Sequence, residues 1–339
     1  MSPGQGIHTL QEFERNHLNR AVAGKGGLAV TLLVTTVMCA LSAVFSGSVT
    51  PANTQSGICL PSPIEWTVSP ILAATANIIL GWTACLGMIS LNKRFNFIPG
   101  TSMLYASVFM TAMWANPWTD SHLSSSAILV CIVLGCTHIL FNLYGRRNAS
   151  QGIFAIFSLL SWGSMTQYAC LLLMPIFMLG AVFLKSFRPR EFAAALLGIA
   201  APYWIMLGSG LLPPESLRYP ELTSIFSGFT PGNGLKWLLA TNGTTAVILI
   251  AAMLANSIRA NSMGVKMRAY HSFINLLGAA MIWYMLFDLG NITAYTATLA
   301  LCLGFQAARY FQLSRLKRTY IYILAIQGTY IILFILSLS

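Results

Sequence analysis

Charged residues are scarce in this sequence. Asp, Glu, Lys and Arg make up 8% of its 339 residues, whereas 56% are hydrophobic, and the mean hydropathy is +0.70. A soluble domain of this length needs more charged side chains to cover its surface. The composition therefore excludes a soluble globular protein and favours a polytopic membrane protein.

The motifs of soluble enzymes and of metal sites are also missing. There is no GxGxxG, GxxxxGK[ST], HExxH or GxSxG. The seven cysteines show no CxxC spacing, and all except Cys59 lie in apolar runs, so neither a disulfide framework nor a metal site is predicted. His138 and Asn142, four residues apart, favour a hydrogen bond between helices over a ligand pair. No cofactor is predicted.

A basic face for nucleic acid is missing as well. The net charge is +11, but the cations come in twos and threes between apolar runs. Nucleic-acid binding needs basic residues gathered on one accessible face. The cations are therefore interpreted as topology signals, and nucleic acid is not a predicted partner.

Long apolar runs fill most of the chain. Because about 20 apolar residues cross a bilayer, the runs predict an all-α polytopic membrane helix bundle of about eleven transmembrane segments, two of them short. No boundary or repeat divides residues 1–339, so a single integral membrane domain is expected. The segments are Gly27 to Phe45, Val68 to Leu91, Ile98 to Ala115, Leu123 to Leu143, a pair within Gly152 to Leu184, Phe192 to Leu212, Leu235 to Ile258, Tyr270 to Phe287, Ile292 to Tyr310, and Thr319 to Leu338.

The pair within Gly152 to Leu184 is short for two crossings. It has 33 residues, whereas two spans and a turn need roughly 40. The sequence predicts either two short helices or a re-entrant hairpin. Its polar middle, Ser161 to Tyr168, is expected to line a watered cavity, because backbone at that depth needs polar surroundings. Ordinary packing irregularity is the alternative.

Lysine and arginine predict the orientation. With a cytoplasmic N-terminus, all but two of the 19 cations fall in inner segments, as the positive-inside rule requires. The prediction is N-in and C-out. Residues 1–25, with an apolar stripe of Ile7, Leu10, Phe13 and Leu18, are expected to form a cytoplasmic interfacial helix, the alternative being a solvated tail.

The two outward cations, Arg218 and Lys236, belong to a long outer loop over residues 208–236. Arg218 is the only outward arginine, and its planar donor fork suits a phosphate. Glu215 and Glu221 lie three residues to either side, so a local ion-pair cluster explains the same residues. Arg218 and Glu221 are candidate substrate-binding residues.

A second outer loop, ANPWTDSHLSS, holds Trp118, Asp120 and His122. A carboxylate beside a histidine and an indole ring can bind a sugar or act as a general base. An interfacial aromatic belt with a helix capped at Ser121 is the competing interpretation.

Two resemblances extend these interpretations. The run from LNKRFNFIPGTSMLYASVFMTAMWANP to FRPREFAAALLGIAAPYW, about residues 90–210, resembles an uncharacterised family of polytopic inner-membrane proteins of Bacteroidota. More weakly, the N-in arrangement, the short middle helices and LLLMP followed by a basic loop and a proline-containing span resemble C-type-fold glycosyltransferases that use polyprenyl-phosphate sugars.

The second resemblance implies roles for the outward residues. Glu65 or Asp120 would be the catalytic base, although Glu65 lies near the second span rather than at the end of the first. Arg218 would hold the lipid-linked phosphate. The expected partners are membrane lipid and a polyprenyl-phosphate sugar, in a bacterial inner membrane. A non-catalytic membrane subunit or scaffold of an envelope assembly, and a lipid or small-solute transporter, are the alternatives.

Overall fold

The structure is a computed structural model, and every regular element in the part that it describes is a helix. The described residues are 21–45, 57–63, 66, 68–98, 103–117, 122–146, 148–211, 233–258, 264–313 and 319–338. Their helices are α2 (Lys25–Phe45), α3 (Pro70–Phe95), α4 (Leu104–Met113), α6 (Ser125–Asn142), α7 (Ser150–Thr166), α8 (Ala169–Phe183), α9 (Pro189–Gly208), α11 (Asn233–Ile258), α12 (Val265–Phe287), the 3₁₀ turn η5 (Leu289–Asn291), α13 (Ile292–Leu313) and α14 (Thr319–Leu338).

The predicted all-helical class is confirmed, and each predicted segment overlaps one α-helix, with the short pair counted as two. Seven helices in the described part are long and apolar enough to cross a membrane, namely α2, α3, α6, α9, α11, α12 and α14. They give the chain the character of a multi-pass membrane protein. The remaining helices, α4, α7, α8 and α13, are shorter or less apolar, so eleven crossings stay a prediction.

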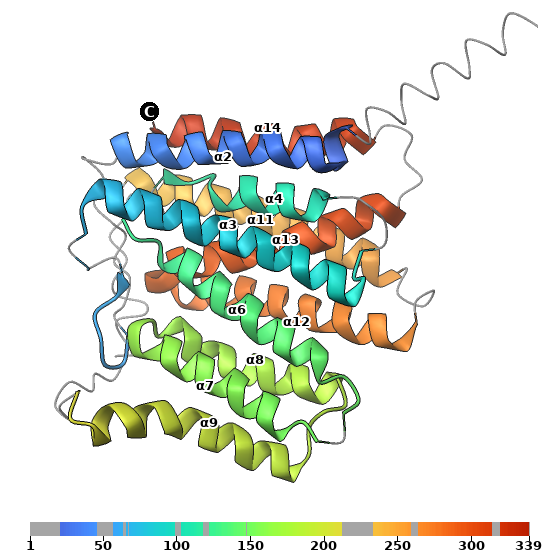
Figure 1. The fold of residues 1–339 in the computed structure, drawn as a ribbon. Coiled ribbons are helices and arrows are strands. Elements are labelled where there is room, and N and C mark those ends of the chain that lie inside the picture. Colours follow the sequence, from blue (N-terminus) through green and yellow to red (C-terminus); the bar gives the residue numbers. More distant parts are fainter. Residues whose placement is uncertain are drawn as a thin grey trace, which may run out of the picture.

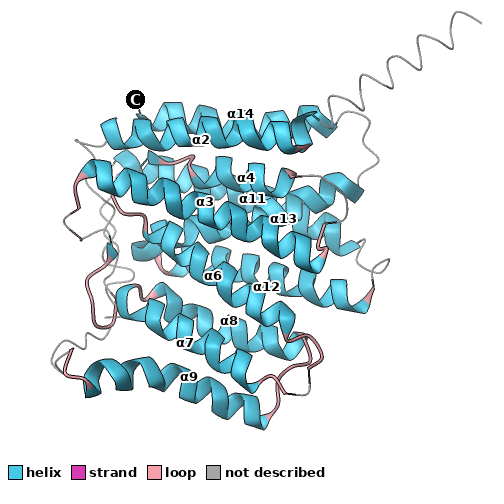
Figure 2. Cartoon of the chain, in the orientation of Figure 1, coloured by secondary structure: helices cyan, strands magenta, loops and turns pink. Residues whose placement is uncertain are grey.

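The helices lie side by side with roughly parallel axes, and the chain reverses at two opposite edges of the bundle (Figures 1 and 2). One edge carries nearly all the described cations, among them Lys93, Arg94, Arg146, Arg188 and Lys266; we call it the basic edge. The opposite edge receives the ends of α2, α9 and α12 and the starts of α3 and α13.

The centre of the bundle is built from two helices outside the seven long apolar ones, the short α4 and the less apolar α13. Every residue of α4 is buried, and most of α13 is buried with it, including the polar Thr296, Thr298 and Gln306. The two helices touch closely, because a Cβ on Gly304 would lie 2.4 Å from the backbone oxygen of Tyr105. A helix surrounded by protein does not need a lipid-compatible surface, which explains why α13 lacks the hydropathy of the outer helices.

The segment with too few residues for two full spans forms two short antiparallel helices. α7 and α8 are joined by Gln167 and Tyr168, and α7 packs chiefly on α9. Their turn lies inside the edge formed by the start of α3 and the end of α9, and the chain around residues 57–63 runs beside it (Figure 1). The turn thus places the polar residues Gln167 and Tyr168 toward the opposite edge of the bundle.

Candidate functional site

Most of the site residues predicted from the sequence lie outside the described residues. These are Glu65, Trp118, Asp120, Arg218 and Glu221. Their predicted meeting around a lipid-linked sugar stays a prediction.

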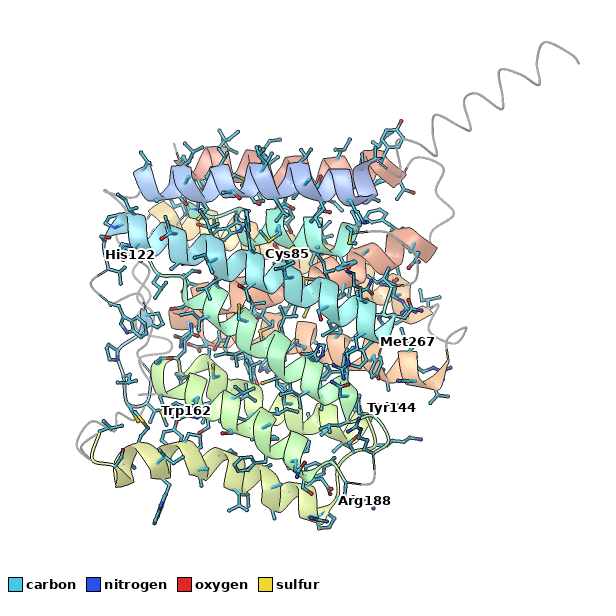
Figure 3. All side chains as sticks on the ribbon, viewed as in Figure 1. Cys85, His122, Tyr144, Trp162, Arg188 and Met267 are labelled. Atoms are coloured by element: carbon cyan, nitrogen blue, oxygen red, sulfur yellow. The ribbon has the colours of Figure 1, made fainter. Side chains whose placement is uncertain are left out.

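His122 is the predicted site residue that the structure describes, and it lies at the opposite edge (Figure 3). Its backbone oxygen accepts a hydrogen bond from Asn77 Nδ2 at 2.7 Å, and Asn77 Oδ1 accepts one from the backbone N–H of Ser124 at 2.8 Å. Asn77 on α3 therefore holds the backbone of His122 and Ser124 in place just before α6 begins. The cap expected at Ser121 is wrong: α6 begins at Ser125, and Ser124 accepts from the backbone N–H of Ala127. The Nδ1 atom of His122 is buried without a partner.

A buried carboxylate closes the turn between α12 and α13. Asp288 is 3% exposed. Its oxygens accept two contacts from Asn291 Nδ2, at 3.1 and 2.9 Å, and one from the Tyr295 hydroxyl at 2.7 Å. Three such contacts replace the solvation that a carboxylate loses on burial. The arrangement holds Asp288 in place as an acceptor at the opposite edge.

The turn between α7 and α8 lies next to this carboxylate. Tyr168 is close enough to Asp288 to experience its charge. The hydroxyl of Tyr284 on α12 donates to the backbone oxygen of Leu172 on α8 at 2.7 Å, which ties the two elements together. The turn therefore belongs to the same polar cluster as Asp288.

The side chain of Gln167, the first residue of the turn, is buried and forms no hydrogen bond. The side chain is 2% exposed, and neither its Nε2 nor its Oε1 has a partner. On α11 and α13, Asn242 Oδ1 and Thr293 Oγ1 are likewise buried without a hydrogen-bond partner. Unpaired buried polar atoms are uncommon, and they accompany unfilled polar sites or strained functional positions.

A backbone segment covers the end of α7. The N–H groups of Ile58, Cys59 and Leu60 donate to the carbonyl oxygens of Ser164 and Met165 at 2.8–3.2 Å. These are carbonyls that a helix end leaves unpaired. Burial of this segment raises the pKa of the Cys59 thiol. We call residues 57–60 the cover segment and the group Gln167, Tyr168, Asp288, Asn291 and Tyr295 the polar cluster.

The basic edge holds a separate polar network. Asn256 Nδ2 donates to the backbone oxygen and to Oε1 of Gln306, and Gln306 donates to Asn275.

His138 on α6 contacts Arg94 on α3 at 3.1 Å, which confirms the predicted contact between helices for His138. Asn142 instead donates to the His138 carbonyl within the same helix.

Sequence reasoning found part of the polar cluster. The watered cavity expected beside Ser161 to Tyr168 stays a prediction; within that stretch Gln167, which was not singled out, is buried with its side-chain amide unpaired. Asp288 was recognised only as an outward acid. The sequence signal that marks Asp288 is the run DLGNITAYT. In it, Asn291 and Tyr295 follow the acid by 3 and 7 residues, and both donate hydrogen bonds to its carboxylate.

The arrangement can hold a polar, uncharged or hydroxylated group through a carboxylate, an amide and tyrosine hydroxyls. No group of three or more His, Cys, Asp or Glu side chains that could hold a metal occurs among the described residues. A comparison of the chain with protein-family models, curated proteins and solved structures finds no match.

Proposed function

We propose that this multi-pass membrane protein binds the polar head of a lipid-linked substrate at the opposite edge, and that it is a glycosyltransferase-like enzyme acting on polyprenyl-phosphate-linked sugars. The observation that carries the binding step is the unpaired amide of Gln167, 2% exposed beside Tyr168. Leaving a buried donor or acceptor unpaired costs about 1–3 kcal/mol. A fold that keeps such an amide gains when a polar ligand pairs with it.

The proposed topology places this edge outside the cytoplasm. Of the described cations, Lys236 on α11 lies at this edge, whereas the group that includes Lys93, Arg94 and Arg188 lies at the other. The positive-inside rule then makes the basic edge cytoplasmic, with the N-terminus inside and the C-terminus outside. The membrane would be a bacterial inner membrane.

The transfer chemistry is assigned by resemblance. Asp120 or Glu65 would take the proton from an acceptor hydroxyl, and Arg218 would hold the phosphate of the lipid carrier. Trp118, His122 and Glu221 would contact the sugar. The polar cluster supports this assignment by supplying hydrogen-bonding groups at the same edge of the bundle.

The substitution Gln167→Leu tests the proposal. It keeps the side-chain size, so the free energy of unfolding should rise by about 1–3 kcal/mol because two unpaired polar atoms disappear. Binding of a polyprenyl-phosphate sugar should fall by about tenfold, the equivalent of one lost hydrogen bond to ligand. Thermal unfolding in detergent and titration of the purified protein measure the two effects.

The matched control is Thr137→Val, which removes another buried, unpaired hydroxyl far along α6. It should raise stability and leave binding unchanged. Unchanged binding in the Gln167→Leu variant would contradict the binding site. Binding without sugar transfer to any acceptor would favour the non-catalytic alternative.

A further inference from the structure

The lipid-facing side of α3 carries an apolar stripe that ends in two cations. Ile79, Trp82 and Leu86 are 65%, 48% and 66% exposed and recur at helical spacing. One or two turns further along the same side stand Lys93 and Arg94, in the last turn of α3 at the basic edge. The side chains Leu86, Ile89, Ser90, Lys93 and Arg94 line a shallow hollow of about 430 Å³.

No carboxylate in the described part of the chain neutralises the cations in this hollow. Neither Lys93 nor Arg94 has a carboxylate partner among the described residues, where the acids are Glu191 and Asp288. Arg94 Nη1 lies 3.1 Å from His138 Nε2. Since arginine can only donate, His138 must accept at Nε2, and an imidazole that accepts there is neutral. The contact therefore fixes the guanidinium without cancelling its charge.

A cluster of aromatic rings extends from this hollow to α12. The Phe95 ring lies 5.5 Å from that of His138 and 5.6 Å from that of Tyr270. Lys266 Nζ lies 5.8 Å from the rings of Tyr144 and Tyr270. Tyr144 and Met267, the neighbour of Lys266, lie at this same edge (Figure 3). A third cation thus borders the ring cluster from a different helix.

We propose that this hollow binds an acidic phospholipid. The phosphate would lie against Lys93 and Arg94, and one acyl chain would follow Leu86, Trp82 and Ile79 along α3. Charge complementarity selects the head group, because a zwitterionic lipid leaves the two positive charges unmatched, and basic pockets at membrane-helix ends bind anionic head groups in this way. The site goes beyond the proposed function and does not depend on it.

Native mass spectrometry of the full-length protein in a mild detergent tests the site, with phosphatidylglycerol and phosphatidylcholine as competing probes. The double variant Lys93→Gln/Arg94→Gln should lower the affinity for phosphatidylglycerol by roughly thirtyfold, since each surface cation contributes roughly fivefold. The matched control Arg188→Gln/Arg190→Gln removes the same charge from the same edge, at the start of α9. It should bind phosphatidylglycerol as the unmodified protein does.

Three outcomes would overturn the proposal. Equal losses in both double variants would indicate general surface charge rather than a site on α3. Binding of phosphatidylcholine as tight as that of phosphatidylglycerol would show that the site does not distinguish head groups by their charge. Displacement of the lipid by inorganic phosphate alone would identify an anion site without an acyl-chain component. The variant His138→Leu, which frees the Arg94 guanidinium, should weaken phosphatidylglycerol binding by a smaller factor than the double variant.

Discussion

Asp288 illustrates, at the scale of single residues, how a membrane protein keeps a buried carboxylate. Its partners Asn291 and Tyr295 follow it within two helical turns, so the carboxylate and its donors come from one short stretch of chain. A local arrangement of this kind can form before the helices pack, which reduces the cost of ordering it. The same local stretch positions the acceptor oxygens beside the turn of α7 and α8.

Replacing Asp288 with asparagine should destabilise the protein. The amide group has the shape of the carboxylate, but its nitrogen meets donors where an acceptor oxygen stood, so one charge-assisted hydrogen bond is lost. The expected loss in the free energy of unfolding is about 1–3 kcal/mol. Thermal unfolding in detergent measures it. Tyr295→Phe removes one donor only and should cost less; a greater cost for Tyr295→Phe would contradict the assigned role of Asp288.

At the scale of elements, the cover segment depends on a glycine. A Cβ on Gly57 would lie 2.1 Å from the backbone oxygen of Met165, a distance that no flexible side chain can relieve because the neighbour is main chain. Only glycine allows the segment to approach α7 closely enough for the hydrogen bonds from Ile58, Cys59 and Leu60. The contact buries Cys59 against Met165.

Gly57→Ala should therefore lift the cover segment from α7. Exposure would return the raised pKa of the Cys59 thiol toward its usual value, so that more thiolate is present at pH 8 and maleimide reacts faster. Peptide mass spectrometry after timed labelling follows Cys59 individually. Gly208→Ala is the control, because a Cβ there meets nothing within 4 Å. An unchanged labelling rate in Gly57→Ala would show that the segment tolerates the methyl group.

The helices were predictable from the sequence where apolar length alone decides them, and their ends were not. The predicted segment Ile98 to Ala115 contains a helix only from Leu104 to Met113. Ile98 instead exchanges two hydrogen bonds with the Asn92 side chain, at 2.7 and 3.2 Å, which hold it in a buried loop. Hydropathy reports burial in protein and in lipid alike, so it cannot separate such a loop from a helix.

The candidate site was less predictable for a related reason. Gln167 and Asp288 are separated by more than a hundred positions, and only the packing of α8 against α12 brings their neighbourhoods together. Outward acids such as Asp120 and Glu65 stand out in the sequence because it holds only 8 acidic residues. A buried amide that lacks a partner is visible only after every neighbour has been placed.

At the scale of the whole molecule, the alternation of helices between two edges determines where the chain ends. Counting from α2, which starts at the basic edge, each helix reverses direction, and α14 ends at the opposite edge with the C-terminus (Figure 1). The proposed N-in, C-out topology then follows if the basic edge is cytoplasmic. A green fluorescent protein fused after Ser339 should be dark and an alkaline phosphatase fused there active, because the first fluoresces in the cytoplasm and the second folds outside it. The same reporters at the N-terminus should give the reverse pattern. Fluorescence from both ends would mean an even number of crossings, and a single helix such as the short α4 would then be a segment that does not span. The pair α7 and α8 changes the count by two, so it leaves the number odd whether or not it spans.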